Sequence, residues 1–263
     1  MYETNYPTNT STLLSTSLTD KQWQFIKKEL NIQDRKRKHD LREVWNAIFY
    51  LVTTGCQWRM LPNNFPKWQL VYYYYRKWSD VEEFDLLLSK LRGKVRVNMG
   101  QNEHPSLGIA DSQSVRWGNN RSLNGIDGNK KVKGIKRHVV VDKNGFLIAV
   151  MVTIANIYDG KAVYLLMRVL KELCSSVKVI IADGGYRGEV IDTVKKTFGY
   201  LIKVVTSGYK GHGFRPIQKR WIVERTFSWF GNNRRLCRNY ELTFDSAEEM
   251  VKIATIKLLV RKI

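Results

Sequence analysis

The sequence has few cysteines, few acidic residues relative to basic ones, and no long apolar run. Its 263 residues include only 3 cysteines. They lie far apart and form no C-x-x-C pair, which argues against disulfides and a structural zinc site and predicts a reducing compartment. No apolar stretch reaches the roughly 20 residues that cross a membrane, and the first residues lack the basic start and apolar run of a signal peptide. We therefore expect a soluble, cytoplasmic protein with no membrane partner.

Two common catalytic patterns are also missing, whereas positive charge is abundant. The chain contains no G-x-x-x-x-G-K-[ST] phosphate loop, so no nucleotide cofactor is indicated, and no Ser or Cys triad emerges. By contrast, 44 Lys and Arg residues stand against 24 Asp and Glu, a formal net charge of +20. So large an imbalance predicts a polyanionic partner, and nucleic acid is favoured over a membrane surface.

Residues 1–17 are rich in Thr, Ser and Asn and are interpreted as a flexible tail. Residues 18–100 predict an all-α domain that resembles a helix-turn-helix unit. Asp40 is expected to cap a helix over 41–54, and Gly55 to end it in the left-handed conformation that glycine accepts. The other expected helices begin near residue 18 and cover about 68–79 and 81–92, and 92–105 is expected to be a linker.

The helix at 68–79 carries both aromatic and basic residues. Helical spacing directs one stripe inward, made of Trp68, Val71, Tyr75 and Trp78. Arg76 and Lys77 are then left outward, where they could meet bases or phosphates. Two interpretations stand side by side: a DNA-contacting helix, or a four-helix module whose aromatic residues only form a core.

Residues 101–263 predict an α/β domain. The element order is strand, hairpin, helix, strand, helix, strand, helix, which is the order of a ribonuclease H-like fold with a mixed sheet and flanking helices. Asn144-Gly145 marks the hairpin turn, and Asp142 beside it is interpreted as a turn residue. Strands are expected near 107–112, 177–182 and 200–206, and helices near 160–174, 189–197, 217–230 and 246–261.

Three carboxylates occupy related positions in this pattern. Asp111 and Asp183 each end a buried strand, and parallel strands would bring them to one edge of the sheet. Glu224 lies in a helix among aromatic residues, on the side expected to pack towards the sheet. Converging carboxylates without His or Cys suit a hard cation, Mg²⁺ or Mn²⁺, and two such ions can drive phosphodiester displacement. The plain alternatives are that Asp183 caps the next helix and that Glu224 is a surface residue paired with Arg220 or Arg225.

Nearly the whole chain, from about Leu18 to Arg261, resembles the DDE transposases of bacterial insertion sequences, in the group numbered four and five. The resemblance rests on the order and spacing of several stretches, which include T-G-C-Q-W-R-M-L-P, I-A-D-S-Q-S-V, K-V-K-G-I-K-R-H-V-V-V-D, A-D-G-G-Y-R-G and R-W-I-V-E-R-T-F-S-W. It implies a helix-turn-helix head on a ribonuclease H-like catalytic domain. It also implies Mg²⁺-dependent cutting and joining of double-stranded DNA at terminal inverted repeats, with Asp111, Asp183 and Glu224 as the acidic residues.

One signature of this superfamily is only partly present. It places Tyr, Arg, Glu and Lys at fixed intervals along one helix. Arg220 and Glu224 fit the second and third places, whereas Ile217 and Gly231 stand where Tyr and Lys belong. Arg234 or Arg235 is the candidate for the missing cation.

A basic segment over 115–138 is expected to line the DNA path beside the acids, because neutralisation of phosphates dominates such binding. The alternative is a flexible, solvated loop. Across the chain, the residues expected to contact DNA are Arg76, Lys77, Arg121, Lys130, Lys131, Lys133, Lys136, Arg137, Arg220, Arg225, Arg234 and Arg235.

The sequence thus predicts an active DNA transposase that works as a homodimer or higher oligomer on DNA. Two alternatives remain open at this point. One is a catalytically inactive, transposase-derived DNA-binding protein, and the other is a ribonuclease H-like nuclease that does not join strands.

Overall fold

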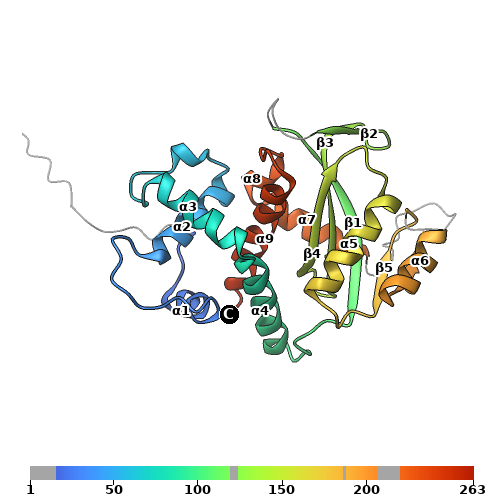
Figure 1. Cartoon of the computed structure of the whole chain (residues 1–263), viewed down its shortest axis with the longest axis horizontal. Coiled ribbons are helices and arrows are strands. Elements are labelled where there is room, and N and C mark those ends of the chain that lie inside the picture. Colours follow the sequence, from blue (N-terminus) through green and yellow to red (C-terminus); the bar gives the residue numbers. More distant parts are fainter. Residues whose placement is uncertain (1–15, 119–123, 186–187, 206–219) are drawn as a thin grey trace, which may run out of the picture.

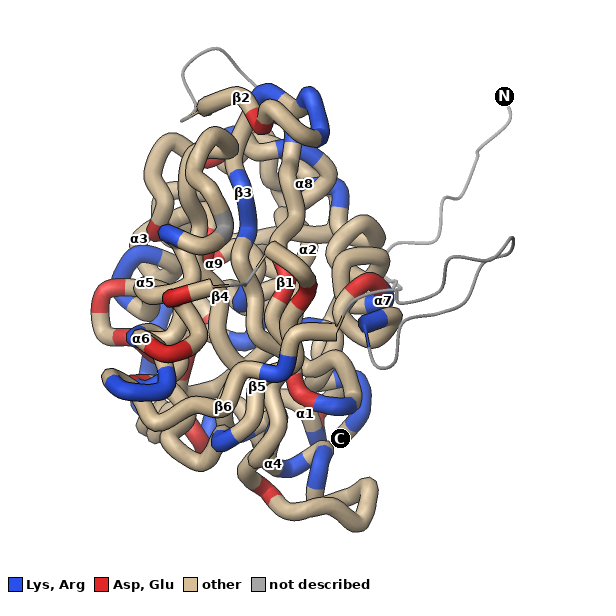
Figure 2. The backbone as a smooth tube through the Cα atoms, turned by 90° about the vertical axis from the view of Figure 1, so that its right-hand side faces the viewer, with Lys and Arg blue, Asp and Glu red and all other residues tan. Residues whose placement is uncertain are grey.

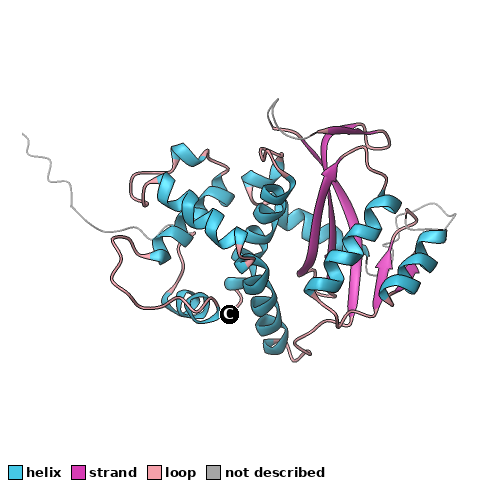
Figure 3. Cartoon of the chain, viewed as in Figure 1, coloured by secondary structure: helices cyan, strands magenta, loops and turns pink. Residues whose placement is uncertain are grey.

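A computed structural model of the chain describes residues 16–118, 124–185, 188–205 and 220–263. Helices gather at one end of the molecule and a mixed sheet forms the other, with α9 (Phe244–Val260) between them (Figure 1). All strands belong to the sheet end (Figure 3). The architecture is the α/β fold expected from the sequence, a ribonuclease H-like mixed sheet preceded by helices. The expected tail falls almost wholly outside the described residues.

The N-terminal helices begin and end where the local sequence directs them. The first four are α1 (Asp20–Glu29), α2 (Leu41–Thr54), α3 (Trp68–Asp80) and α4 (Glu83–Asn98), with a 3₁₀ turn at Trp58–Met60. Thr19 and Gln22 form a capping box that starts α1, and the Asp40 side chain accepts from the Arg42 amide at the start of α2. Gly55, at φ 71°, ends α2 as expected. These caps satisfy amides that would otherwise lack partners.

Helix α3 divides into the two faces that its sequence predicts. Val71, Tyr75 and Trp78 are buried, and Trp78 stacks on Trp45 of α2 with ring centroids 4.9 Å apart. On the other face Tyr73 is 58% exposed. The aromatic stripe therefore forms core, while a polar and aromatic face remains open to solvent.

Helix α4 is longer than expected, so the prediction that a linker begins at residue 92 is wrong. Leu91 and Val95 continue the apolar stripe of α4 and are buried. Arg92 and Arg96, which suggested a polar linker, are buried as well. Arg92 donates from Nη1 to the Leu147 carbonyl over 2.8 Å, and this hydrogen bond connects α4 to β4 of the sheet.

Within the described residues the sheet has six strands and mixed directions. They are β1 (Leu107–Arg116), β2 (Gly125–Asp127), β3 (Val132–Val141), β4 (Leu147–Ile154), β5 (Val179–Ala182) and β6 (Leu201–Val204). Strand β3 pairs antiparallel with β1, β2 and β4, whereas β1, β5 and β6 run parallel. The parallel crossovers use α5 (Asp159–Leu173) and α6 (Glu189–Phe198), and α7 (Arg220–Gly231) and α8 (Arg234–Cys237) follow.

Alternate residues of the strands face two different layers of helices. Ile109 of β1 and Ile181 of β5 belong to the core that also holds α4, α7 and α9. Their neighbours Ala110 and Ile180 belong to the second core, with α5 and α6. This is the period of two expected for a strand buried on both faces. It decides on which side of the sheet every later residue of β1 and β5 emerges.

Helix α9 connects the two ends of the molecule. It packs on α4, α2 and β4, and its Met250, Ile253 and Ile256 share one buried core with α2. The division into residues 18–100 and 101–263 stays a prediction, because the two parts meet in this common core. In the part of the chain that the structure describes, no helix is both long and apolar enough to span a membrane.

Candidate active site

Strand geometry brings Asp111 and Asp183 to the same side of the sheet. Ile109 and Ile181 are register partners in the parallel pair of β1 and β5. Asp111 follows Ile109 by two residues and Asp183 follows Ile181 by two, so both acids share the side of the sheet on which those isoleucines lie. That is the side covered by α7, which lies next to β1 (Figure 2).

Arg220, at the start of α7, connects all three predicted acids. Its Nε lies 3.8 Å from Oδ2 of Asp111 and 4.0 Å from Oε1 of Glu224. Its Nη2 lies 3.4 Å from Oδ2 of Asp183. The three carboxylates, which are distant in sequence, are therefore gathered around one guanidinium group.

Glu224 does not lie where the aromatic residues around it suggested. Its side chain is 60% exposed, and the neighbouring Trp221 is 49% exposed. The face of α7 that packs on the sheet instead carries Ile222, Val223 and Thr226, which are buried. The expectation that Glu224 packs towards the sheet is wrong, because that face is already filled. Glu224 reaches the other acids from the solvent side.

The site becomes more buried from Glu224 through Asp183 to Asp111. The side chain of Asp111 is 11% exposed and that of Asp183 is 27% exposed. The pKa of Asp111 is raised to about 6, mainly by burial and to a smaller extent by the charge of Asp183, although the Ser112 amide and Arg220 act to lower it. Such a carboxyl group favours a nearby cation, because a positive charge offsets its cost of ionisation.

The donor atoms suit a hard cation. Asp111 accepts the Ser112 amide on Oδ1, and Asp183 accepts the Gly185 amide on Oδ1, so the Oδ2 atom of each faces the shared space. Within the described part of the chain, the oxygens that face this space belong to carboxylates, which Mg²⁺ and Mn²⁺ prefer as ligands. Among the described residues, no three Asp, Glu, His or Cys side chains already stand close enough to hold a metal ion. The Arg220 guanidinium lies between these carboxylates instead.

Four of the cations expected to contact DNA have partners inside the protein. Arg137 is 2% exposed and donates to the Leu236 carbonyl over 2.9 Å. Lys136 donates to the Ile157 carbonyl over 3.0 Å, and the buried Arg235 pairs with Glu241 at 2.7 Å. Arg225 is half-buried between Trp221 and Trp229, 4.8 Å from each ring centroid.

These four positions are corrections to the expected DNA path. Lys136 and Arg137 belong to β3, so the basic segment over 115–138 is not one loop. Strand β3 is buried on both faces over this stretch, so the consecutive residues Lys136 and Arg137, which point to opposite sides of the sheet, are both buried. Arg225 and Arg235 pack within the helical layer. A cation held in this way is not available to a phosphate, so we leave these four out of the interface.

The remaining expected cations lie at the surface or close to the acids. Lys131 is exposed at the turn between β2 and β3, and Lys133, near the start of β3, is exposed and lies over the Trp117 ring at 4.4 Å. Lys130, in the same turn, donates to the Ser112 carbonyl, next to Asp111. Lys77 and Arg234 are exposed too, whereas Arg76 is half-buried and pairs with Asp80. Arg121 lies outside the described residues.

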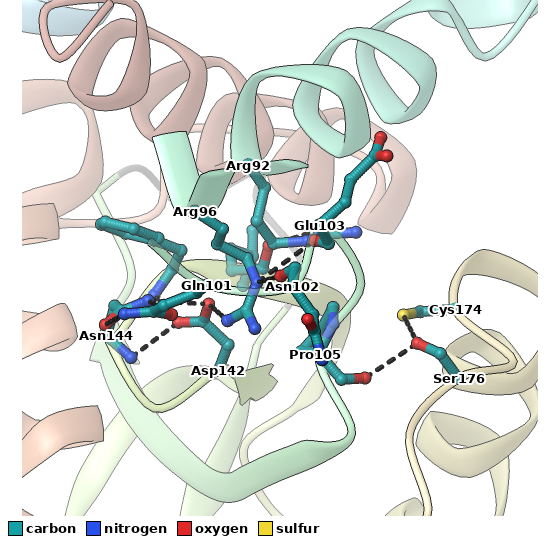
Figure 4. Close-up of polar contacts among 12 residues, drawn as sticks. Arg92, Arg96, Gln101, Asn102, Glu103, Pro105, Asp142, Asn144, Cys174 and Ser176 are labelled. Carbon is teal, nitrogen blue, oxygen red and sulfur yellow. Dashed lines mark hydrogen bonds and ion pairs between the residues drawn. The ribbon is translucent and has the colours of Figure 1, made fainter. Parts of the chain in front are cut away.

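The β3–β4 turn belongs to a buried polar network. Asp142 acts as the turn residue that the sequence predicts, since its Oδ1 accepts the amides of Asn144 and Phe146. Its Oδ2 also pairs with Arg96 of α4, and Asn144 exchanges hydrogen bonds with Gln101 (Figure 4). The Asn144-Gly145 pair predicts the turn, but no local sequence pattern predicts its contacts with Arg96 and Gln101.

Two family models match parts of the chain. Residues 102–259 match a family model described as "Transposase DDE domain", and residues 18–88 match one described as "Putative transposase of IS4/5 family". The chain is similar to a Burkholderia cepacia protein described as "Putative transposase for insertion sequence element IS402". The two are 29% identical over 153 residues, which cover 55% of this chain and 70% of that relative.

A solved structure titled "Crystal structure of the Mos1 mariner paired end complex with Mn" is also similar over 92% of this chain and 83% of that one, at 10% identity and a TM-score of 0.33. A similarity at this level supports no conclusion of its own. The family model for the DDE domain, by contrast, spans more than half of the chain, and the resemblance seen in the sequence is confirmed. The chain therefore belongs to the DDE-type DNA transposases.

Proposed function

We propose that Asp111, Asp183 and Glu224 are the catalytic carboxylates of this transposase and that together they bind divalent metal. The observation that supports the proposal most strongly is the position of Arg220, within 4.0 Å of an oxygen of each acid. A DDE transposase acts on DNA with a divalent metal ion. We propose Mg²⁺ or Mn²⁺ here, because carboxylate oxygens are the hard ligands that these ions prefer. We propose two ions, because a pair can stabilise both the attacking and the leaving oxygen of a phosphodiester.

The protein contributes position and charge to the reaction. When bound, the ions would activate a water molecule or a 3′-hydroxyl group and stabilise the leaving oxygen of a phosphodiester. Asp111 is the most buried of the acids and is fixed by the Ser112 amide, so it provides the rigid side of the site. Glu224 is exposed, which leaves it able to approach when DNA arrives. The reaction is cleavage at the terminal inverted repeats followed by strand transfer.

The proposed DNA path runs along the surface cations nearest to these acids. Lys130 and Lys131 lie at the β2–β3 turn and Lys133 near the start of β3, and Lys130 donates to the Ser112 carbonyl next to Asp111. Arg234 is exposed directly after α7 and is our candidate for the cation that the helix signature lacks. We propose Arg76 and Lys77 on α3 as contacts for the terminal repeats. Pairing of two DNA ends would require at least a dimer.

The test uses Asp183→Asn and Glu224→Gln, which remove one charge each with little change in volume. Each should lower Mg²⁺-dependent cleavage and strand transfer by about 10³-fold or more, since several kcal/mol of transition-state stabilisation are lost. Binding of the element's own terminal repeats should persist. Glu172→Gln is the control, because Glu172 is an exposed partner of Arg168 on α5 and should leave all activities unchanged.

Cleavage that survives both active-site substitutions would mean that other residues perform the chemistry. Wild-type protein that binds its ends but never cleaves them in Mg²⁺ or Mn²⁺ would point instead to a DNA-binding protein without activity. Cleavage without strand transfer would indicate a nuclease.

A further inference from the structure

One positive group, the Arg220 guanidinium, lies among three acids but makes only one hydrogen bond to them in the described part of the chain, and that bond is long. Its Nε is buried and has no hydrogen-bond partner among the described residues. The nearest carboxylate oxygens are those of Asp111 and Glu224, at 3.8 and 4.0 Å, beyond hydrogen-bond reach. Nη2 makes one long contact of 3.4 Å with Asp183. The guanidinium is therefore held mainly by electrostatic attraction to the carboxylates, and another cation can replace it there.

We propose that Arg220 is a built-in counter-cation that competes with metal for Asp111, Asp183 and Glu224 until DNA draws it away. This inference rests on the proposed function, because it takes the three acids to be the metal site. It adds that metal affinity is coupled to DNA binding through a single side chain.

The competition follows from electrostatics. Three carboxylates brought together repel one another unless a positive charge lies between them, and Arg220 supplies that charge in the free protein. A divalent ion on the same oxygens would lie next to the guanidinium, and the two cations would repel each other. Metal can bind well only if Arg220 moves out of the space that it shares with the acids.

The side chain of Arg220 is able to make that move. It is 34% exposed and belongs to the first residue of α7, so it can turn towards solvent without disturbing the helix interior. A DNA phosphate is a suitable acceptor, because the planar guanidinium can bind it through two parallel hydrogen bonds. Once there, Arg220 would stabilise the bound strand and leave the three acids to the metal.

Linkage makes this coupling reciprocal. If DNA raises the affinity for metal by some factor, metal raises the affinity for DNA by the same factor. The free protein would then hold little metal, and an active site would be completed only on a DNA end. Metal-dependent strand cleavage would be confined to the assembled complex.

The experiment measures binding of Mn²⁺ alone to the full chain by electron paramagnetic resonance, with and without a duplex carrying the terminal repeat. Wild type should bind Mn²⁺ weakly and gain roughly tenfold with DNA, in the usual range of coupling. Arg220→Met should bind roughly tenfold more tightly without DNA and gain little when DNA is added. Arg220→Gln is a second neutral variant, whose side-chain amide can still donate a hydrogen bond to the acids. It replaces Arg220→Met in the experiment if Arg220→Met does not fold.

Two control variants distinguish failure of the proposed metal site from failure of the proposed competition by Arg220. Arg168→Met removes one positive charge from an exposed pair on α5 and should behave as wild type. Asp183→Asn should lose Mn²⁺ binding with and without DNA. Were Asp183→Asn to bind normally, the proposed metal site itself would be wrong. Were Mn²⁺ binding to depend on Asp183 while the neutral Arg220 variants matched wild type in both conditions, only the competition would be overturned.

Discussion

The Thr226 hydroxyl donates a hydrogen bond of 2.8 Å to the backbone carbonyl of Gly145, 81 residues away in sequence. Beside it, Arg225 donates from Nη2 to the Asn144 carbonyl over 2.7 Å. The two residues that follow Glu224 in α7 are thus attached to the β3–β4 turn. The position of the helix that carries Glu224 depends on a hairpin turn that holds none of the three acids.

Gly145→Ala should destabilise the protein and weaken cleavage together. Gly145 has φ 84°, and a Cβ there would lie 2.8 Å from Oγ1 of Thr226 and 3.2 Å from the Trp229 ring. Strain and contact together should lower the free energy of unfolding by about 1–3 kcal/mol. Urea denaturation measures that decrease, and cleavage per folded molecule should fall because α7 is displaced.

Two other glycines serve as controls for this variant. Gly100 has φ 68° but open space around its Cβ position, so Gly100→Ala isolates backbone strain at about 1 kcal/mol. Gly128 has open space and no positive φ, so Gly128→Ala should be close to neutral. A Gly145→Ala protein as stable and as active as Gly100→Ala would show that the attachment of α7 to the turn is unimportant.

Arg96→Met should be far more costly than loss of a surface ion pair. The side chains of Arg96 and Asp142 are 5% and 0% exposed, so removal of one partner leaves a buried charge alone. The expected loss is about 3–5 kcal/mol in the free energy of unfolding. Arg168→Met, which breaks a pair with side chains 68% and 64% exposed, should cost at most about 0.5 kcal/mol. Equal losses in the two variants would contradict the importance of burial.

Glu248 should make stability fall as pH rises from about 4.5 to 7. Burial raises the pKa of Glu248 from 4.5 to about 7, whereas Lys252 and the hydrogen bond from the Val152 amide lower it. In that window the folded protein binds more protons than the unfolded chain, so unfolding becomes easier with increasing pH. Glu248→Gln keeps an acceptor for Val152 without the charge. It should be more stable than wild type at pH 8, by on the order of 2 kcal/mol, with little difference at pH 4.5.

Thermal denaturation of both proteins across this pH range provides the comparison. The difference between the two curves should grow from pH 4.5 upwards and level off above 7. A constant difference across the range would show that Glu248 titrates in the folded protein as it does in the unfolded chain.

Substitutions of basic residues within 115–138 should affect either DNA binding or stability, depending on whether the residue is exposed or buried. The double change Lys131→Ala and Lys133→Ala should weaken DNA binding and lower the slope of log affinity against log salt by about 1 for each phosphate that is no longer neutralised. Arg137→Met should leave that slope unchanged and lower thermal stability, because Arg137 is buried against the Leu236 carbonyl. Fluorescence anisotropy at several salt concentrations measures the slopes. A reduced slope for Arg137→Met would place that residue back on the DNA path.

The sequence predicted best what depends on local pattern. Apolar runs precede both Asp111 and Asp183, and the alternation of side chains along the two strands carries both acids to the α7 side. The prediction that a strand ends at Asp111 is wrong, because β1 pairs with β3 as far as Arg116. The side of α7 occupied by Glu224 could not be inferred, because aromatic neighbours mark either a core face or a surface. Whether Lys136 and Arg137 point inwards likewise depends on β3 lying inside the sheet, which is a long-range property. The role of Arg220 emerges only when two strands and a helix meet.

The core shared by α9 and the N-terminal helices has a consequence for biosynthesis. Helices α2 and α4 leave the ribosome long before α9, yet α9 supplies Met250, Ile253 and Ile256 to their core. We expect nascent chains that end before Phe244 to remain sensitive to protease within their first hundred residues. A truncated product would then be unable to occupy the element's ends as a competing, inactive binder, which would protect transposition from its own incomplete copies.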